Sequence, residues 1–279
     1  MNDNDSIVTQ VRQAYGSVAR QALEGPTDTS CSPGCCVAPR PDASASLGYD
    51  SADLAKVPEG ANLGLGCGNP QRFADLSVGQ TVLDLGSGGG LDCFLAAEKV
   101  GEEGRVIGID MTADMVSLAR RNQGPDHPQV SFRLGEIEHL PVGDGEVDVI
   151  ISNCVFNLSP NKGQVMREAY RVLRPGGRLA IGDVVAIAPL PDRLKQSMDA
   201  YAGCIGGAST VDELRQHLEA AGFSEIGVEV DTQMREAIAS WLPGQGLEDI
   251  VASARITATK PGGKSCCAPS CCEEEPASA

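Results

Sequence analysis

The glycine-rich loop at residues 84–90 constrains the fold of this chain more than any other stretch. It follows residues 81–86, TVLDLG, a short apolar run typical of a buried strand. It precedes residues 91–100, LDCFLAAEKV, whose apolar residues have helical spacing. Glycines at such a turn let the backbone approach a ligand without Cβ clashes. The loop therefore predicts a strand–turn–helix unit built to hold a small molecule.

Strand and helix patterns alternate along the chain after this unit. Further strands are predicted at residues 105–110, 130–135, 146–155, 177–185, 225–230 and 254–260, and helices at 112–122 and near 163–174. Such alternation is typical of an α/β, Rossmann-like fold, in which a mostly parallel sheet carries helices on both faces. We expect seven strands. A helix is also predicted at residues 6–24, and residues 190–221 are predicted to be largely helical.

Composition divides the chain into four segments. Residues 1–48 combine the N-terminal helix with a flexible cysteine-containing segment, and residues 49–187 carry the ligand-binding domain. Residues 188–260 are expected to complete the sheet in a smaller C-terminal substrate-binding region. Residues 261–279, PGGKSCCAPSCCEEEPASA, have the low complexity of a disordered tail.

The charge of the chain excludes several classes of partner. With 22 basic and 38 acidic residues the formal net charge is -16, which repels nucleic acid and anionic membranes. No segment approaches the ~20 apolar residues that a membrane-spanning helix needs. The first residues, MNDNDS, lack the basic and apolar features of a secretion signal. We therefore expect a cytoplasmic protein, a monomer, that acts on a small molecule.

Eleven cysteines are unusual for a chain of this size and location. In a reducing cytosol, cysteines more often serve reactivity or soft-metal binding than disulfide frameworks. Cys93 lies in an apolar helix and is best explained as a small core residue. Vicinal cysteines at 35–36, 266–267 and 271–272 are suited to capturing trivalent arsenic or a soft metal, although an unstructured tail with incidental cysteines is the alternative.

The spacing of the glycines distinguishes between cofactors. A dinucleotide fingerprint, G-x-G-x-x-G, would need glycine where Leu91 stands, and the Gly-Lys-Ser/Thr of a P-loop is absent. The pattern D-x-G-x-G-x-G, with Asp84, Gly86, Gly88 and Gly90, instead resembles motif I of class I methyltransferases. A carboxylate at residue 84 also suits S-adenosylmethionine, which carries a sulfonium and an ammonium group and no phosphate.

Two later motifs agree with that resemblance. Asp110, at the end of the second predicted strand, is positioned to accept hydrogen bonds from both ribose hydroxyls, and Met111 follows it. By resemblance, Glu136 and Ile137 frame the adenine. The stretch RVLRPGGRLAIGD is similar to the region leading into the fifth strand of the methyltransferase fold.

A closer resemblance comes from the stretches that contain cysteine. Residues 49–50, 55–70, 84–97, 108–116, 152–158 and 201–208 resemble the signature stretches of arsenite methyltransferases. Tyr49 and Asn153 fall within them and are further candidate cofactor contacts. The resemblance implies that the arsenic-binding and catalytic cysteines are Cys67 in LGLGCGNP, Cys154 in SNCVFNL and Cys204 in GCIGGA. A fourth cysteine comes from Cys35 or Cys36, and the sequence does not choose between them.

The resemblance implies a function for the chain. Thiolates hold trivalent arsenic, delivered as an arsenite–thiol conjugate, and its lone pair takes the methyl group of S-adenosylmethionine. A cysteine pair, with Cys67 and the N-terminal cysteine as candidates, then returns arsenic to the trivalent state, and glutathione or thioredoxin reopens the disulfide. Two alternatives stay open: methylation of a small organic metabolite, and metalloid binding without turnover.

Overall fold

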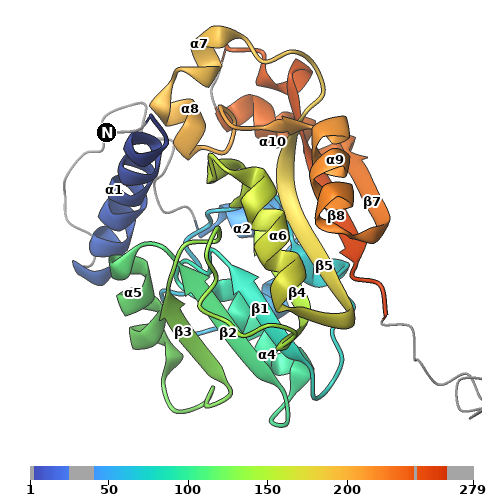
Figure 1. Ribbon diagram of the computed structural model, residues 1–279. Coiled ribbons are helices and arrows are strands. Elements are labelled where there is room, and N and C mark those ends of the chain that lie inside the picture. Colours follow the sequence, from blue (N-terminus) through green and yellow to red (C-terminus); the bar gives the residue numbers. More distant parts are fainter. Residues whose placement is uncertain (1–2, 25–40, 242–243, 263–279) are drawn as a thin grey trace, which may run out of the picture.

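A single mixed sheet forms the centre of the molecule in this computed structural model, which describes residues 3–24, 41–241 and 244–262. The strand order is β3-β2-β1-β4-β5-β8-β7 (Figure 1). The short β6 pairs with β5. The strands are β1 (Thr81–Leu85), β2 (Arg105–Asp110), β3 (Val130–Leu134), β4 (Val147–Asn153), β5 (Leu173–Ala186), β6 (Ser209–Thr210), β7 (Ser224–Asp231) and β8 (Val251–Thr259).

The expected α/β, Rossmann-like fold is confirmed, with one strand more than the seven expected. The extra strand, β6, has two residues that pair with Val185 and Ala186 at the end of β5, and so short a strand has no periodicity to recognise. Strands β1 to β5 pair in parallel, whereas β8 runs antiparallel to both β5 and β7. The carboxyl ends of β1, β2, β4 and β5 therefore meet at one edge.

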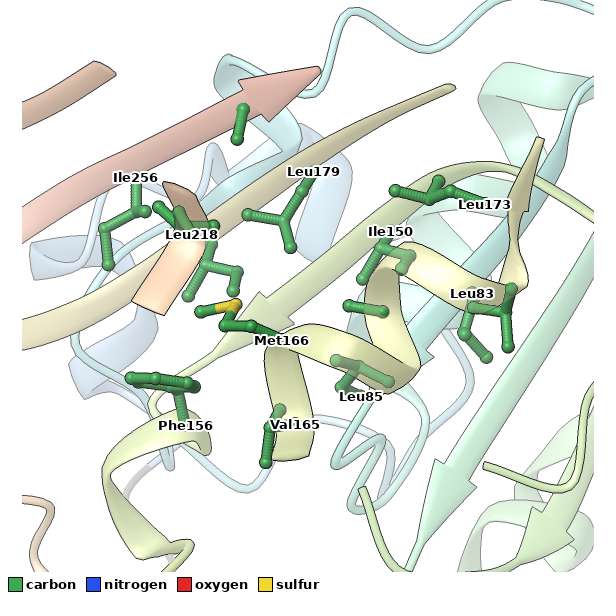
Figure 2. Packing of buried hydrophobic residues seen from close by; sticks show 14 of the residues in the cluster. Leu83, Leu85, Ile150, Phe156, Val165, Met166, Leu173, Leu179, Leu218 and Ile256 are labelled. Atoms are coloured by element: carbon green, nitrogen blue, oxygen red, sulfur yellow. The ribbon is translucent and has the colours of Figure 1, made fainter. Parts of the chain in front are cut away.

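Helices cover both faces because neighbouring residues of a strand point to opposite sides. Val82 of β1 packs in a cluster with Phe94 of one covering helix, whereas Leu83 packs with Met166 of another. Figure 2 shows Leu83, Met166 and Leu218 in the second cluster. The helices are α1 (Asp3–Glu24), α2 (Ala43–Ser46), α3 (Ser51–Leu54), α4 (Leu91–Val100), α5 (Ala113–Gln123), α6 (Lys162–Val172), α7 (Asp192–Lys195), α8 (Met198–Ala202), α9 (Val211–Ala221) and α10 (Arg235–Trp241).

Helix α1 lies beside α5 and reaches α8 near the carboxyl edge of the sheet (Figure 1). Its Arg20 pairs with Asp114 of α5, and Arg12 pairs with Glu136 at 2.9 Å. The Tyr15 hydroxyl donates a hydrogen bond to the Ala202 carbonyl at 3.0 Å. Helix α1 is thus attached to α5, to the residues after β3 and to α8, which lie near the carboxyl edge of the sheet.

The region after β5 is less helical than the sequence indicates. Residues 190–221 contain α7, α8, β6 and α9, where one glycine-interrupted helical region was expected. Thr210 begins α9 with a capping box to Glu213, and Gly222 ends it with φ +100°. Four 3₁₀ helices complete the described elements: η1 (Pro70–Arg72), η2 (Phe156–Leu158), η3 (Thr232–Met234) and η4 (Leu247–Asp249). Among the described helices, none is long and apolar enough to cross a membrane.

Candidate active site

A pocket opens at the carboxyl ends of β1, β2 and β4, the edge at which open α/β sheets bind ligands. The loop after β1, the turn after β2 and the residues after β4 each contribute to its wall. Tyr15 of α1 also lines it, although nothing in the sequence pattern marks that tyrosine. The pocket is therefore enclosed by the sheet edge and by the N-terminal helix.

The glycine loop is held in an unusual backbone conformation. Gly86 has φ +72° and Gly88 has φ +51°, values that L side chains rarely adopt. The amides of Gly86 and Ser87 both donate to the Ile109 carbonyl, at 2.7 and 2.9 Å, so the loop is tied to β2. Gly90 lies outside the pocket lining. It precedes α4 with φ +98°, and a Cβ there would overlap with the ring of Phe94.

Asp110 joins the loop to the start of α5. One carboxylate oxygen accepts the Gly88 amide at 3.0 Å and the other accepts the Thr112 amide at 2.8 Å. Burial raises the pKa of Asp110, and these two backbone donors oppose that rise. The carboxylate is thereby fixed at the pocket wall with acceptor capacity left for a ligand that carries hydroxyl groups.

Two further polar groups in the wall fit a cationic, hydroxyl-bearing cofactor. The Ser87 hydroxyl is buried at the wall and has no hydrogen-bond partner among the described residues, so it is available to a ligand. Asp84 is 3 % exposed, and burial raises its pKa well above the ordinary value. A sulfonium or ammonium group beside Asp84 would favour the ionised carboxylate.

A second buried carboxylate, Asp92, was not recognised in the sequence because an acid in the first turn of a helix usually serves as an exposed cap. Here it is 8 % exposed and accepts the Tyr49 hydroxyl at 2.9 Å. Burial raises the pKa of Asp92 to about 6, while the hydrogen bonds from Tyr49 and Gln71 lower it. The Cys93 thiol donates to Asp84 at 3.2 Å, so it is buried as expected but also satisfies a pocket carboxylate.

Asn153, at the end of β4, connects the pocket to the cysteine region. Its side-chain NH2 donates to the Tyr49 hydroxyl at 2.9 Å and to the Gly68 carbonyl at 2.7 Å. Its side-chain oxygen accepts the Cys67 amide at 3.1 Å. One amide therefore positions a wall residue of the pocket and the loop that carries the first candidate cysteine.

Three candidate cysteines lie in one buried region. Cys67 and Cys154 form a disulfide with a Cα–Cα distance of 5.8 Å. The Cys204 thiol donates to the Cys154 carbonyl at 2.7 Å, and burial raises the pKa of this thiol. Cys154 lines the pocket, and Cys154 and Cys204 both adopt positive φ angles, of 57° and 63°. Residues from three distant segments of the chain thus converge beside the pocket.

The remaining site residues predicted from the sequence differ in whether they line the pocket. Met111 and Ile137 line the pocket, whereas Glu136 pairs with Arg12 outside its lining. Cys35 and Cys36 lie outside the described residues. The partner of Cys67 in the structure is Cys154, and the bond does not involve the N-terminal segment.

The fold and the pocket together define a class. A parallel sheet with an antiparallel strand β8, a D-x-G-x-G-x-G motif at the end of β1 and an acid as the last residue of β2 are the features of a class I S-adenosylmethionine-dependent methyltransferase. Comparison with protein families agrees, because residues 76–222 match the model of a methyltransferase domain.

Comparison with individual proteins indicates which family within this class the chain resembles. An arsenite methyltransferase of Halobacterium salinarum is 48 % identical over 276 residues, which cover 93 % of this chain and 70 % of that protein. The arsenite methyltransferase of Mus musculus is 34 % identical over 79 % of this chain, and the match spans 59 % of the mouse protein. A crystal structure of an arsenic(III) S-adenosylmethionine methyltransferase from Chlamydomonas reinhardtii is 30 % identical, with a TM-score of 0.57 over 82 % of this chain and 76 % of that one.

This chain belongs to the arsenite methyltransferase family. A phosphoethanolamine N-methyltransferase of Haemonchus contortus, 19 % identical with a TM-score of 0.59 over 72 % of this chain and 55 % of that one, shares the fold alone. Membership in the family establishes S-adenosylmethionine as the cofactor.

Proposed function

We propose that this protein methylates trivalent arsenic held by cysteine thiolates, with S-adenosylmethionine as the methyl donor. The observation that carries the proposal is the position of Cys154, which lines the cofactor pocket, is bonded to Cys67 and accepts a hydrogen bond from Cys204. Arsenic(III) is soft and thiophilic and binds up to three thiolates in a pyramid, which leaves its lone pair free.

The chain's own residues would position the reacting atoms. S-adenosylmethionine, when bound, supplies an electrophilic methyl group. Asp110, Ser87 and Asp84 would hold this cofactor through its hydroxyl and cationic groups. The thiolates of Cys67, Cys154 and Cys204 would hold arsenic with its lone pair toward the methyl group. Positioning is the main contribution of the protein, since arsenic carries no proton that a general base must remove.

The cysteine pair also accounts for the change in oxidation state. Methylation raises arsenic formally to the pentavalent state. When two thiolate ligands leave as a disulfide, arsenic regains two electrons and becomes trivalent again. The Cys67–Cys154 bond supports this step, because it joins two of the three proposed ligands. An external thiol, glutathione or thioredoxin, would return the pair to thiols by exchange. The reducing cytoplasm suits that step.

The test is separation of arsenic species after incubation of the protein with arsenite, S-adenosylmethionine and a thiol. Methylated arsenicals are expected from the native chain. Cys154→Ser and Cys204→Ser should each abolish them, whereas Cys271→Ser, at a cysteine in the tail, is the matched control and should leave the product yield unchanged. Normal turnover in either site variant would contradict the three-thiolate arrangement. An organic methylated product that survives Cys154→Ser would favour a different acceptor.

A further inference from the structure

A buried carboxylate lies beside the Cys67–Cys154 pair and has no part in the proposed methyl transfer. The two sulfur atoms and a carboxylate oxygen of Asp183 all lie within 4.8 Å of one another. Asp183, on β5, is 1 % exposed, and Cys67 is fully buried. The two thiols that reduction of the disulfide would release, together with this carboxylate, would form a set of metal ligands.

The carboxylate of Asp183 is held in place from several sides. One of its oxygens accepts the Asn157 side-chain amide at 2.8 Å and the Val184 amide at 2.7 Å. The Asn157 backbone amide approaches the other oxygen at 3.4 Å. Carboxylates that bind metals in proteins are themselves held by such hydrogen bonds, which orient the coordinating oxygen. The third ligand is therefore already positioned before any cation arrives.

We propose that, once the disulfide is reduced, Cys67, Cys154 and Asp183 bind one divalent zinc ion. Reduction by a phosphine breaks the S–S bond and gives two thiols, while the phosphine takes an oxygen atom from water and becomes its oxide. The cation then replaces the two thiol protons, which pass to solvent. Three protein ligands with a fourth position open to water form a common zinc arrangement.

The distances suit this cation. Zinc–sulfur bonds of about 2.3 Å and zinc–oxygen bonds of about 2.1 Å in a tetrahedron place the ligand atoms roughly 3.5–3.8 Å apart. The two sulfur atoms, bonded at 2.10 Å in the disulfide, would have to separate to about 3.8 Å after reduction, while the Asp183 oxygen already lies within 4.8 Å of both.

The local charges also balance. Two thiolates and one carboxylate carry three negative charges, and the zinc ion brings two positive ones. The Lys162 ammonium, which interacts electrostatically with Asp183 and Cys204, supplies the remaining positive charge. Arsenic(III) differs because it prefers three sulfur ligands and gains little from an oxygen. Asp183 thus contributes to the binding of zinc much more than to the binding of arsenic.

Zinc would then compete with arsenite for Cys67 and Cys154. Binding of the cation itself goes beyond the proposed function and does not depend on it, whereas competition presupposes that arsenic occupies the same thiols. Zinc would act as an inhibitor of the reduced enzyme, relieved by excess arsenite.

The experiment measures cation binding directly. The full-length chain is used with the seven cysteines at positions 31, 35, 36, 266, 267, 271 and 272 replaced by serine, so that these thiols do not contribute. After reduction and removal of the phosphine without air, Zn²⁺ is titrated calorimetrically. Cd²⁺ is titrated in parallel by its ultraviolet thiolate charge-transfer band. One ion per chain is expected.

Two variants and a control test the ligands. Asp183→Asn should weaken cation binding at least about tenfold. Cys154→Ser should weaken binding as well and should reduce the Cd²⁺ charge-transfer band, because only the Cys67 thiolate remains as a sulfur ligand. Asp148→Asn is the matched control, because Asp148 is a partly buried carboxylate and accepts the Thr81 amide at 2.7 Å. Asp148 lies near the start of β4, away from Cys154, which follows the end of that strand. The Asp148→Asn variant should bind as the parent does. Equal affinity in Asp183→Asn would overturn the proposal.

X-ray absorption at the zinc edge covers the case in which Asp183→Asn fails to fold. Two sulfur and two lighter ligands are expected in the parent chain, and three or more sulfur ligands, or none, would refute the assignment. Arsenic methylation by the unsubstituted chain is assayed separately. If that reaction is absent while zinc binds, the proposed function fails and this inference stands.

Discussion

A methyl group added at Gly86 should destabilise the protein more than the same group added at Gly88. Both residues have positive φ, which costs a residue with a side chain about 1–2 kcal/mol. At Gly86 the added Cβ would also overlap with Val155, one of whose γ-carbons would lie at 2.8 Å. Relieving such overpacking typically costs about 1–3 kcal/mol more. At Gly88 no heavy atom lies within 4 Å of the added Cβ.

We therefore expect Gly86→Ala to lower the free energy of unfolding by about 2–5 kcal/mol and Gly88→Ala by about 1–2 kcal/mol. Val155 directly follows Cys154, so the first variant should also displace that cysteine and reduce methyl transfer. The second adds a Cβ in the pocket wall and should weaken cofactor binding more than its small loss of stability implies. Urea denaturation and calorimetric titration with S-adenosylhomocysteine measure the two effects. Equal stability of the two variants would refute the clash with Val155.

Three further outcomes are expected. Asp110→Asn should weaken S-adenosylmethionine binding by about 10–100-fold, since hydrogen bonds to a charged group contribute about 1.5–3 kcal/mol. Asp126→Asn, at an exposed carboxylate outside the pocket lining, is the control and should leave the affinity unchanged; equal affinities of the two variants in calorimetry would argue against the role of Asp110. Burial raises the pKa of Asp183 from 3.8 to about 6, so the folded state holds this proton more tightly than the unfolded chain does. The contribution of Asp183 to stability is therefore full below about pH 4 and falls by about 3 kcal/mol as the pH rises through 6. The difference in free energy of unfolding between the native chain and Asp183→Asn should change by that amount in urea titrations at different pH values. A difference that does not change with pH would contradict the raised pKa of Asp183. Cys93→Ala should lower the free energy of unfolding by about 1–3 kcal/mol, because it removes the hydrogen-bond donor to buried Asp84. Cys93→Ser keeps a donor and should lose less stability. Denaturation curves in which Cys93→Ser is the less stable variant would count against this hydrogen bond.

Part of the sheet could be predicted because strands such as β1 and β2 are largely apolar runs that end at a glycine or an acid. The predicted strand 105–110 coincides with β2, and the predicted helix 91–100 coincides with α4. From β5 onward, the predicted elements differ more from the observed ones. Strand β5 begins at Leu173, before the predicted residue 177, because Leu173 pairs with Val147 across a register shift. Helix α10 and the short β6 were not predicted, since each is short and depends on tertiary contacts.

The residues of the site also differ in how far their positions could be predicted from the sequence. Asp110 ends β2 and the loop glycines follow β1, so their position at the carboxyl edge could be inferred from the order of elements. The network of Tyr49, Asp92 and Asn153 could not, because it joins three segments whose sequences carry no shared periodicity. Asp183 was missed for another reason. It lies within a strand buried on both faces, where an acid between apolar residues gives no indication of its neighbours.

The bond between Cys67 and Cys154 closes a loop with a sequence separation of 87 residues, and that loop contains β1 through β4. Cross-linking a loop of that length removes disorder from the unfolded chain worth about 4–5 kcal/mol at room temperature in the chain-entropy description. The half of the molecule that binds the cofactor is thus harder to unravel when oxidised than when reduced. In the proposed thiol cycle, resistance to heat or to proteases would therefore be greater in the disulfide form than in the reduced form.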